Sequence, residues 1–316
     1  MATVNISLQE ANSIDAAIDE IRKDRASGAA KLTLRAAKLL VKCAQETPHT
    51  VAKVARGLMA AQPAMGSVYN LAERALFSSD VTTTCLGFLE AMEENTVRVA
   101  ERAAALIQEG TAVMTYSFSS TILAAFREAW RRGKQFSVIC PESRPVCEGL
   151  AMAASLGMAG IPSSLIADSA IYQLLPEVDL VLVGTDAVCR RGIVNKTGTT
   201  LLALAARDLK VPIYALCSSD KLLPRTYDPP PEEPKDSREL LEREMPNVKV
   251  RNYNFDVTPL TYLCGIVTEE GILSPVEMRE RLRETASPRE QLSAGPLRLP
   301  DGSVLVSRQP EPVPAA

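Results

Sequence analysis

The segment around Asp186 places a carboxylate, an amide and a cation within a short stretch of chain. Asp186 comes directly after the apolar run DLVLVG, and Asn195 and Lys196 precede Gly198 and a predicted helix start. The unpaired N–H groups and the dipole of a helix start favour an anion such as phosphate. A carboxylate beside an anchored phosphate suits acid/base chemistry on a polyol. The segment therefore predicts a site for a small phosphorylated sugar, with Asp186 as the acid/base.

Polar residues also follow the other apolar runs of the same half of the chain. Ser117 and Ser119 stand at a predicted strand-to-helix turn, where Ser119 is either a helix cap or a ligand contact. Arg144, held between Ser143 and a proline, can present a planar fork to a phosphate. Asp168 is explained by N-capping of the next helix, and Lys221 supplies another cation.

The elements that would position these residues begin after Gly110. Apolar runs rich in β-forming residues occur at 111–116, 136–140, 163–167, 179–184 and 212–217, and helical patterns separate them. This alternation is typical of a parallel sheet covered by helices on both faces, a Rossmann-like doubly wound α/β fold. Ligands bind such sheets outside the carboxyl ends of the strands. We therefore expect the residues after the five strands to converge on one pocket.

The sequence divides into three parts. Residues 1–108 carry helical periodicity and no convincing strand, which predicts an all-helical N-terminal domain. Residues 109–285 form the predicted Rossmann-like domain, with an exposed proline-rich loop at 225–237 and a last helix that starts at Ser274. Residues 286–316 are rich in proline and lack periodicity, so we expect a flexible tail with at most one short hairpin at 301–302.

Composition argues against several classes of function. The net charge is −3, aromatic residues make up 4%, and no basic run is present, so nucleic acid is not an expected partner. No apolar stretch approaches the ~18 residues of a membrane span, so no membrane partner is expected either. No G-x-G-x-x-G follows a strand and no P-loop motif occurs, so no cofactor is expected.

The cysteines and the single histidine point to a cytoplasmic protein without a metal site. The seven cysteines are scattered, form no C-x-x-C pair and lie in part within apolar runs, which predicts reduced, buried thiols. The first residues do not resemble a secretory signal. His49 is interpreted as a surface residue, and one histidine cannot form a His-rich metal site.

The chain resembles the translation initiation factor 2B alpha/beta/delta family, which includes ribose-1,5-bisphosphate isomerases and methylthioribose-1-phosphate isomerases. The resemblance covers residues from about 25 to 284 in the family's order, and its most specific block is GTDA…IVNKTGT. The matching segments are RASGAA (25–30), QPAMGSVYNLAERA (62–75), GTAVMTYSFSST (110–121), FSVICPESRPVCEG (136–149), IADSA (166–170), 178–206, VPIYALCSSDKLLP (211–224) and FDVTPLTYLCGIVTEEGILSP (255–275).

The resemblance implies an N-terminal helical domain, a Rossmann-like domain, and a homodimer that stacks into hexamers in some members. In the isomerases, a cysteine after the first strand and an aspartate after the fourth convert a ribose 1-phosphate into a ribulose. Asp186 matches the aspartate, but Ser117 stands in place of the cysteine, and Tyr116 replaces the usual histidine. The residues that the resemblance assigns to substrate binding are Arg25, Gly28, Ala29, Ser119, Arg144, Asn195, Lys196 and Lys221.

Three functions remain open from the sequence. The first is an isomerase of a ribose-1-phosphate derivative, with Asp186 as acid/base and Ser117 in an altered role, because a serine hydroxyl hardly ionises without an adjacent base. The second is a non-catalytic regulatory subunit or sensor that binds a sugar phosphate or a nucleotide monophosphate. The third is a guanine-nucleotide-exchange subunit that acts with partner chains.

Overall fold

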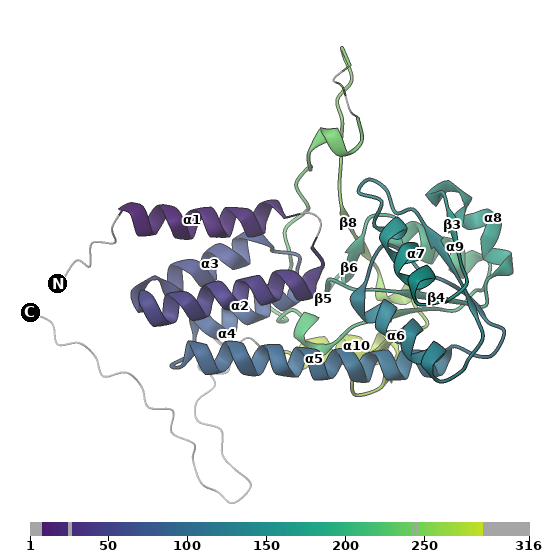
Figure 1. The fold of residues 1–316 in the computed structure, drawn as a ribbon, viewed down its shortest axis with the longest axis horizontal. Coiled ribbons are helices and arrows are strands. Elements are labelled where there is room, and N and C mark those ends of the chain that lie inside the picture. The colour runs from purple at the N-terminus through teal and green to yellow at the C-terminus, as the bar shows by residue number, and fades with distance from the viewer. Residues whose placement is uncertain (1–7, 25–26, 242, 244, 287–316) are drawn as a thin grey trace, which may run out of the picture.

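Five helices form the N-terminal part of the protein in the computed structural model, which describes residues 8–24, 27–241, 243 and 245–286. They are α1 (Leu8–Lys23), α2 (Ala29–Glu46), α3 (Val51–Ala61), α4 (Gly66–Leu76) and α5 (Val81–Leu106). The helices form because apolar residues recur at helical spacing, and those residues pack into one aliphatic core. The long helix α5 runs along both parts of the molecule (Figure 1).

A seven-stranded sheet forms the second part. Its strands are β1 (Ala112–Met114), β2 (Ser137–Pro141), β3 (Ser163–Ile166), β4 (Leu180–Val183), β7 (Ile213–Leu216), β9 (Gly265–Val267) and β10 (Ile272–Leu273). The strand order is β10-β9-β7-β4-β1-β2-β3, and every pair is parallel except β9 with β10. The five predicted strands are thus confirmed. The strand order reverses between β1 and β4, where doubly wound sheets bind their ligands.

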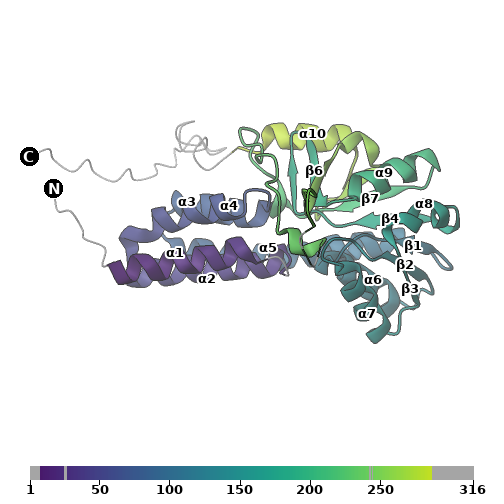
Figure 2. The same cartoon turned by 90° about the horizontal axis from the view of Figure 1, so that it is seen from above.

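Helices cover both faces of this sheet, as the sequence predicted. The first face packs against α5, α6 (Ser120–Arg131) and α7 (Glu148–Met158), and the second against α8 (Ile171–Leu174), α9 (Thr199–Asp208) and α10 (Pro275–Glu284). Figure 2 shows α9 and α10 on one side of the sheet and α6 and α7 on the other. Ser274 caps α10 with a capping box, as expected from the sequence. Within the described ranges, no helix combines the length and apolarity of a membrane span.

A second, antiparallel sheet was not anticipated. It consists of β5 (Ala187–Cys189), β6 (Gly192–Lys196) and β8 (Phe255–Thr258), in the order β5-β6-β8. The sequence shows no pattern typical of a strand between Asp186 and Gly198. The reason is that β5 is three residues long and buried throughout, so it shows no alternation of polar and apolar side chains. This sheet presents Asn195 and Lys196 from a strand instead of a loop.

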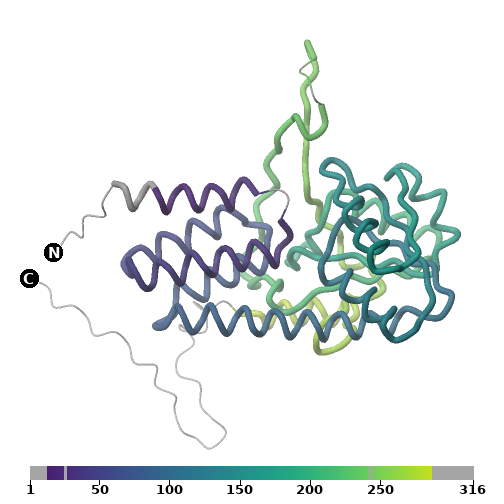
Figure 3. The backbone as a smooth tube through the Cα atoms, in the orientation of Figure 1, coloured from purple at the N-terminus to yellow at the C-terminus, as the bar shows by residue number. Residues whose placement is uncertain are grey.

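The proline-rich segment predicted as an exposed loop forms an arm. The chain leaves the body near residue 225, runs outward and returns into β8 (Figure 3). The arm is anchored at its base, where Glu232 accepts hydrogen bonds from the N–H groups of Asn254 and Phe255. Of the predicted tail, residues 287–316, including the expected hairpin at 301–302, lie outside the described residues.

Candidate active site

The carboxyl ends of the parallel strands bring five polar side chains into one region, and the second sheet adds a sixth. Ser117 follows β1, Arg144 and Glu148 follow β2, Asp186 follows β4, and Lys221 follows β7. Lys196 reaches the same region from β6 of the second sheet. We call Ser117, Arg144, Glu148, Asp186, Lys196 and Lys221 the strand-end site.

Asp186 is a partly buried carboxyl group of the strand-end site. Burial raises its pKa from 3.8 to about 6; Glu148 adds to the rise, while Lys221 and Lys196 oppose it. Among the described residues, its carboxylate has no hydrogen-bond partner, while its backbone N–H donates to the carbonyl of Val194 over 2.8 Å. A carboxyl group that titrates near neutral pH can both donate and accept a proton.

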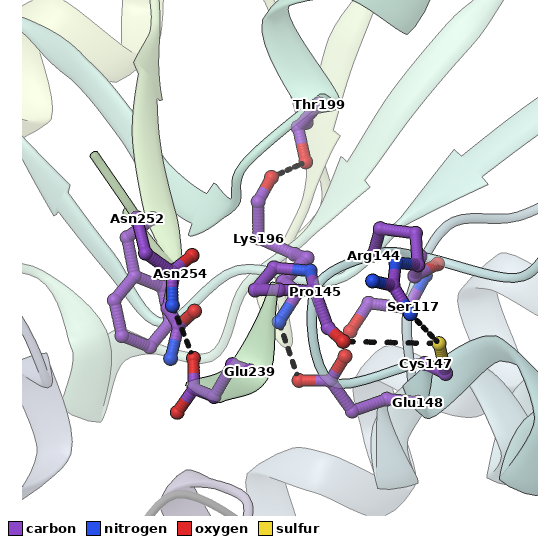
Figure 4. A network of polar contacts seen from close by, with 12 residues as sticks. Ser117, Arg144, Pro145, Cys147, Glu148, Lys196, Thr199, Glu239, Asn252 and Asn254 are labelled. Carbon is purple, nitrogen blue, oxygen red and sulfur yellow. Dashed lines mark hydrogen bonds and ion pairs between the residues drawn. The ribbon is translucent and has the colours of Figure 1, made fainter. Parts of the chain in front are cut away.

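Lys196 and Glu148 form a partly buried ion pair beside Asp186. Nζ of Lys196 lies 2.7 Å from Oε1 of Glu148, and the Lys196 side chain is only 4% exposed. The second oxygen of Glu148, Oε2, is buried and has no hydrogen-bond partner among the described residues. Figure 4 shows this pair between the Arg144 side chain and the base of the arm. Lys196 therefore holds a carboxylate in this structure, and a phosphate would have to share or replace that contact.

Ser117 and Arg144 are held by a network that the sequence did not reveal. The N–H of Ser117 donates to Oγ of the buried Ser143 over 2.7 Å. The carboxylate of Asp168 accepts the N–H groups of Ser143 (2.8 Å) and Arg144 (2.7 Å). The prediction that Asp168 caps its own helix is therefore wrong, because its side chain turns to the β2 loop instead. This anchoring leaves the Arg144 guanidinium exposed at the site.

Ser119 and Asn195 line the floor between β1 and β4. Ser119 caps α6, with its Oγ accepting the N–H of Ile122 over 3.4 Å, and its side chain packs against Gly184. A Cβ at Gly184 would approach Ser119 within 2.8 Å, so glycine is needed there. The side-chain amide of Asn195 donates to Oγ1 of Thr199 over 2.9 Å. Of the two alternatives left open for Ser119, the structure shows the cap.

The predicted anion site at the start of α9 is already filled by the protein. The N–H groups of Gly198 and Thr200 donate to Oδ2 of Asp256 over 2.8 and 3.1 Å. Asp256 lies on β8, opposite Asn195, so only the pairing of two distant segments brings it there. Because a carboxylate occupies this helix terminus, the helix itself is not the phosphate-binding element that the sequence predicted.

The N-terminal helices complete the strand-end site from one side. The N–H of Gly66, the first residue of α4, donates to the backbone oxygen of Asp186 over 2.9 Å. The side-chain amide of Asn70 donates to the carbonyls of Asp220 (2.7 Å) and Leu222 (2.9 Å), on either side of Lys221. The ammonium group of Lys221 has no hydrogen-bond or ion-pair partner among the described residues, and its charge acts on Asp186.

The first motif assigned to substrate binding is described only in part. Gly28 precedes α2 with extended backbone, and Ala29 is the buried first residue of that helix. Arg25 lies outside the described residues. In the part of the chain that the structure describes, no three His, Cys, Asp or Glu side chains are grouped to hold a metal ion.

A surface hollow of about 510 Å³ lies at the opposite edge of the sheet. It is lined by residues at the amino ends of β1, β4 and β7, including Thr111, Asp179 and Tyr214. None of the strand-end site residues contributes to it, so we do not assign the function to this hollow.

Sequence reasoning missed Glu148, Ser143 and Asp256. The place of Glu148 at the site could have been predicted, since it starts a helix directly after the Arg144 loop. An acidic residue at a helix start is also explained by the helix dipole, so the position alone did not single it out. Ser143 and Asp256 carried no signal, because their roles arise from contacts with residues 26 and 58 positions away.

Comparison with known proteins agrees with this architecture. The sequence profile of the Initiation factor 2 subunit family matches residues 25–275. A Pyrococcus horikoshii protein named translation initiation factor eIF-2B subunit 2-like is 34% identical over 267 residues, which cover 81% of this chain and 94% of that protein. An Archaeoglobus fulgidus protein named ribose 1,5-bisphosphate isomerase is 32% identical over 300 residues, which cover 88% of this chain and 96% of that protein.

Solved structures show the same fold. The crystal structure of a Pyrococcus horikoshii translation initiation factor eIF-2B matches with a TM-score of 0.76 and 33% identity, covering 83% of this chain and 97% of that one. A 5-methylthioribose 1-phosphate isomerase from the same organism matches with a TM-score of 0.65 over 85% of this chain and 86% of that one; at 22% identity it supports the fold alone. The profile match and the relatives place this chain in the initiation factor 2 subunit family.

Proposed function

We propose that the protein is a sugar-phosphate isomerase, which converts a ribose-1-phosphate derivative of the ribose 1,5-bisphosphate type into the corresponding ribulose. The observation that carries the proposal is the Asp186 carboxyl group at the switch point of the sheet, with its pKa raised to about 6 and no protein hydrogen bond among the described residues. A relative named ribose 1,5-bisphosphate isomerase, aligned over most of both chains, supports it.

The proposed reaction needs an acid at the ring oxygen. The phosphate on C1 prevents spontaneous ring opening, so the C1–O4 bond breaks only when O4 receives a proton. Protonated Asp186 donates that proton and, as a carboxylate, accepts the proton of the C2 hydroxyl when C2 becomes a ketone. Asp186 is thereby regenerated, while one hydrogen moves from C2 to C1. A pKa of about 6 leaves both forms populated at neutral pH.

The phosphate groups of the substrate would be held by the cations of the strand-end site. Arg144 presents an exposed guanidinium, and Lys221 carries an ammonium group without a partner among the described residues. Lys196 is the third cation, which exchanges its contact with Glu148 for one with the ligand. Ser117 is 9% exposed and has no base hydrogen-bonded to its hydroxyl among the described residues, so it donates a hydrogen bond to the sugar or accepts one from it instead of ionising.

The test is to incubate the purified protein with ribose 1,5-bisphosphate and, separately, with methylthioribose 1-phosphate, and to follow ribulose formation by NMR. We expect turnover of one of them, and a loss of at least about 100-fold in Asp186→Asn with binding retained in calorimetry. Asp208→Asn, at the distant end of α9, is the control and should keep full activity. Absence of turnover with both sugars contradicts the isomerase.

A non-catalytic sensor is the second candidate, and one observation favours it. Glu148 neutralises Lys196 in the strand-end site, and Ser117 has no adjacent base, so the site can bind an anion without supplying every group for turnover. Measurable binding of a sugar phosphate or nucleotide monophosphate without turnover would establish this function. Lys196→Ala should lose binding under either function.

We also propose that the protein is a homodimer. Apolar side chains are exposed on α7 and the edge strand β3, with Leu150 46%, Met158 82% and Leu165 50% exposed, and such surfaces are often covered by a second copy. Sedimentation of the full chain should give twice the monomer mass, and a monomer at micromolar concentration would contradict the proposal.

A further inference from the structure

Two loops at the strand-end site hold serine residues in a backbone conformation that serine rarely adopts. Ser117, after β1, has a φ of 63°, and Ser143, after β2, has a φ of 64°. A β-carbon makes this left-handed region unfavourable, so a residue other than glycine stays there only where its surroundings hold it. Because β1 and β2 are paired parallel strands, the two strained loops are neighbours at the carboxyl edge of the sheet.

The Ser143 side chain joins the two loops. Its Oγ accepts the N–H of Ser117 over 2.7 Å and donates to the carbonyl oxygen of Pro141 over 3.1 Å. Ser143 is 0% exposed, so no solvent reaches this hydroxyl. Removing the hydroxyl would therefore leave the buried N–H of Ser117 without its acceptor, which is unfavourable for the conformation that the bond holds.

The backbone of Ser143 ties the same loop to the chain that follows β3. The N–H groups of Ser143 and Arg144 donate to the two oxygens of the Asp168 carboxylate over 2.8 and 2.7 Å. The carbonyl oxygen of Ser143 accepts the N–H of Cys147 over 3.1 Å. Ser143 thus connects the chain after β1 to the chain after β3, and Arg144 is fixed as part of this connection.

The two neighbours of this connection are placed to contact a ligand, whereas Ser143 is not. Ser117 belongs to the strand-end site, and Arg144 is exposed there. Figure 4 shows both side chains together with the Glu148–Lys196 pair. Since Ser143 has no exposed surface, it cannot touch a ligand and can act only through Ser117 and Arg144.

We propose that Ser143 is a positioning residue of the strand-end site, which holds the Ser117 backbone in its left-handed conformation so that Ser117 and Arg144 face one ligand. This inference rests on the proposed function, of which it requires only that a sugar phosphate binds, with or without turnover. Without the Ser143 hydroxyl, Ser117 relaxes to the negative φ that its β-carbon favours, and its own hydroxyl moves with it. Side chains that are already held in place lose little conformational freedom when the ligand binds.

A double-mutant cycle tests this role. In calorimetry with ribose 1,5-bisphosphate, Ser143→Ala should lose at least about tenfold in affinity, but less than about threefold in a Ser117→Gly background. Glycine adopts a positive φ without strain and carries no hydroxyl to position, so the Ser143 hydroxyl has little effect there. A merely structural role would lower the affinity equally in both backgrounds. Ser155→Ala is the matched control, because its Oγ donates within α7 to Ala151, and it should keep wild-type affinity.

Hydrogen exchange tests the same contact without a ligand. In Ser143→Ala, the amide proton of Ser117 should exchange at least about tenfold faster by NMR, because its acceptor is removed, while the amide of Val181 in β4 keeps its wild-type rate. Unchanged exchange at Ser117, or equal losses of affinity in the two backgrounds, overturns the role of Ser143 and leaves the proposed function in place. Failure of the proposed function is a different result, in which the wild-type protein binds no sugar phosphate, and this inference is then overturned with it.

Discussion

Asp186 is held in the folded protein at an energetic cost that depends on pH. Because its folded pKa is raised from 3.8 to about 6, the folded state binds this proton more tightly than the unfolded state does. The contribution of Asp186 to the free energy of unfolding is therefore most favourable below pH ~4. It declines as the pH rises and is lost above the folded-state pKa. The rise of roughly two pKa units corresponds to a decrease of at most about 3 kcal/mol in the free energy of unfolding between low and high pH. The decrease is smaller where water reaches the carboxylate.

Asp186→Asn should consequently stabilise the protein at neutral pH. Its Tm and its free energy of unfolding should exceed the wild-type values at pH 7.5, and the gain should disappear near pH 4. Asp80→Asn is the contrast, because hydrogen bonds from Thr83 lower the pKa of Asp80, so its contribution to stability is present above the unfolded-state pKa and is lost as the pH falls through the lowered folded-state pKa. That variant should lose stability at pH 7.5, and the loss should shrink in acid. An Asp186→Asn variant that is less stable at pH 7.5 would contradict the cost assigned to burial.

Glu148 adds to the rise in the pKa of Asp186 that burial causes, as well as holding Lys196. Its negative charge raises the pKa of Asp186, so Glu148→Gln should move the Asp186 titration below pH 6 while leaving an amide oxygen for Lys196. Carboxyl carbon-13 NMR measures this titration directly. Glu280→Gln on the exposed face of α10 is the control and should leave the titration unchanged. An unshifted titration in Glu148→Gln would show that the two carboxylates do not interact.

At the scale of single elements, the end of α9 shows where the sequence is not optimal for its own structure. Lys210 has a φ of 60° after the last turn, where its N–H donates to Arg207 and the N–H of Val211 donates to Ala206. This is the Schellman arrangement, in which the left-handed position is usually glycine. A β-carbon makes that conformation unfavourable, so lysine is strained there.

Lys210→Gly should therefore stabilise the protein by about 0.5–1 kcal/mol in urea denaturation. The same change at Lys38, an exposed position inside α2, should destabilise by about 1 kcal/mol, since glycine is unfavourable in a helix interior. If glycine changes the free energy of unfolding equally at both positions, the backbone conformation of Lys210 does not determine the effect of Lys210→Gly.

At the scale of the whole molecule, the strand-end site depends on the contact between the helices and the sheet. The start of α4 packs so closely on the turn after β7 that a Cβ at Gly66 would overlap the carbonyl oxygen of Lys221. Asn70 bonds to carbonyls on both sides of that lysine, and Tyr69 stacks on Tyr227 with ring centres 4.0 Å apart. The helices thus fix the position of Lys221 beside Asp186.

Gly66→Ala should weaken ligand binding without unfolding the helices. We expect calorimetry to show at least about a tenfold loss in affinity for inorganic phosphate, which corresponds to a binding free energy that is less favourable by about 1.4 kcal/mol. Helical circular dichroism should be unchanged. Gly87→Ala in α5, where a Cβ meets no atom within 4 Å, should keep wild-type affinity and gain stability. Wild-type affinity in Gly66→Ala would show that this contact does not shape the site.

Local sequence patterns were enough to predict the fold class and the chain positions at which the strands end. Apolar runs of five or six residues between helical patterns identified five of the parallel strands, because burial on both faces of a parallel sheet requires continuous apolar residues. Asp186, Ser117, Arg144 and Lys221 followed from this prediction, since polar residues directly after such strands lie at one edge of the sheet. The local sequence pattern was therefore sufficient to predict these four residues of the strand-end site.

The contacts of those side chains, in contrast, follow from how distant segments of the chain pack together. The pairing of Lys196 with Glu148, the use of Asp168 to hold the Arg144 loop, and the carboxylate of Asp256 at the start of α9 all join segments 24 to 58 residues apart. Such contacts leave no periodicity in the sequence, because a side chain's partner depends on how strands and loops pack in space.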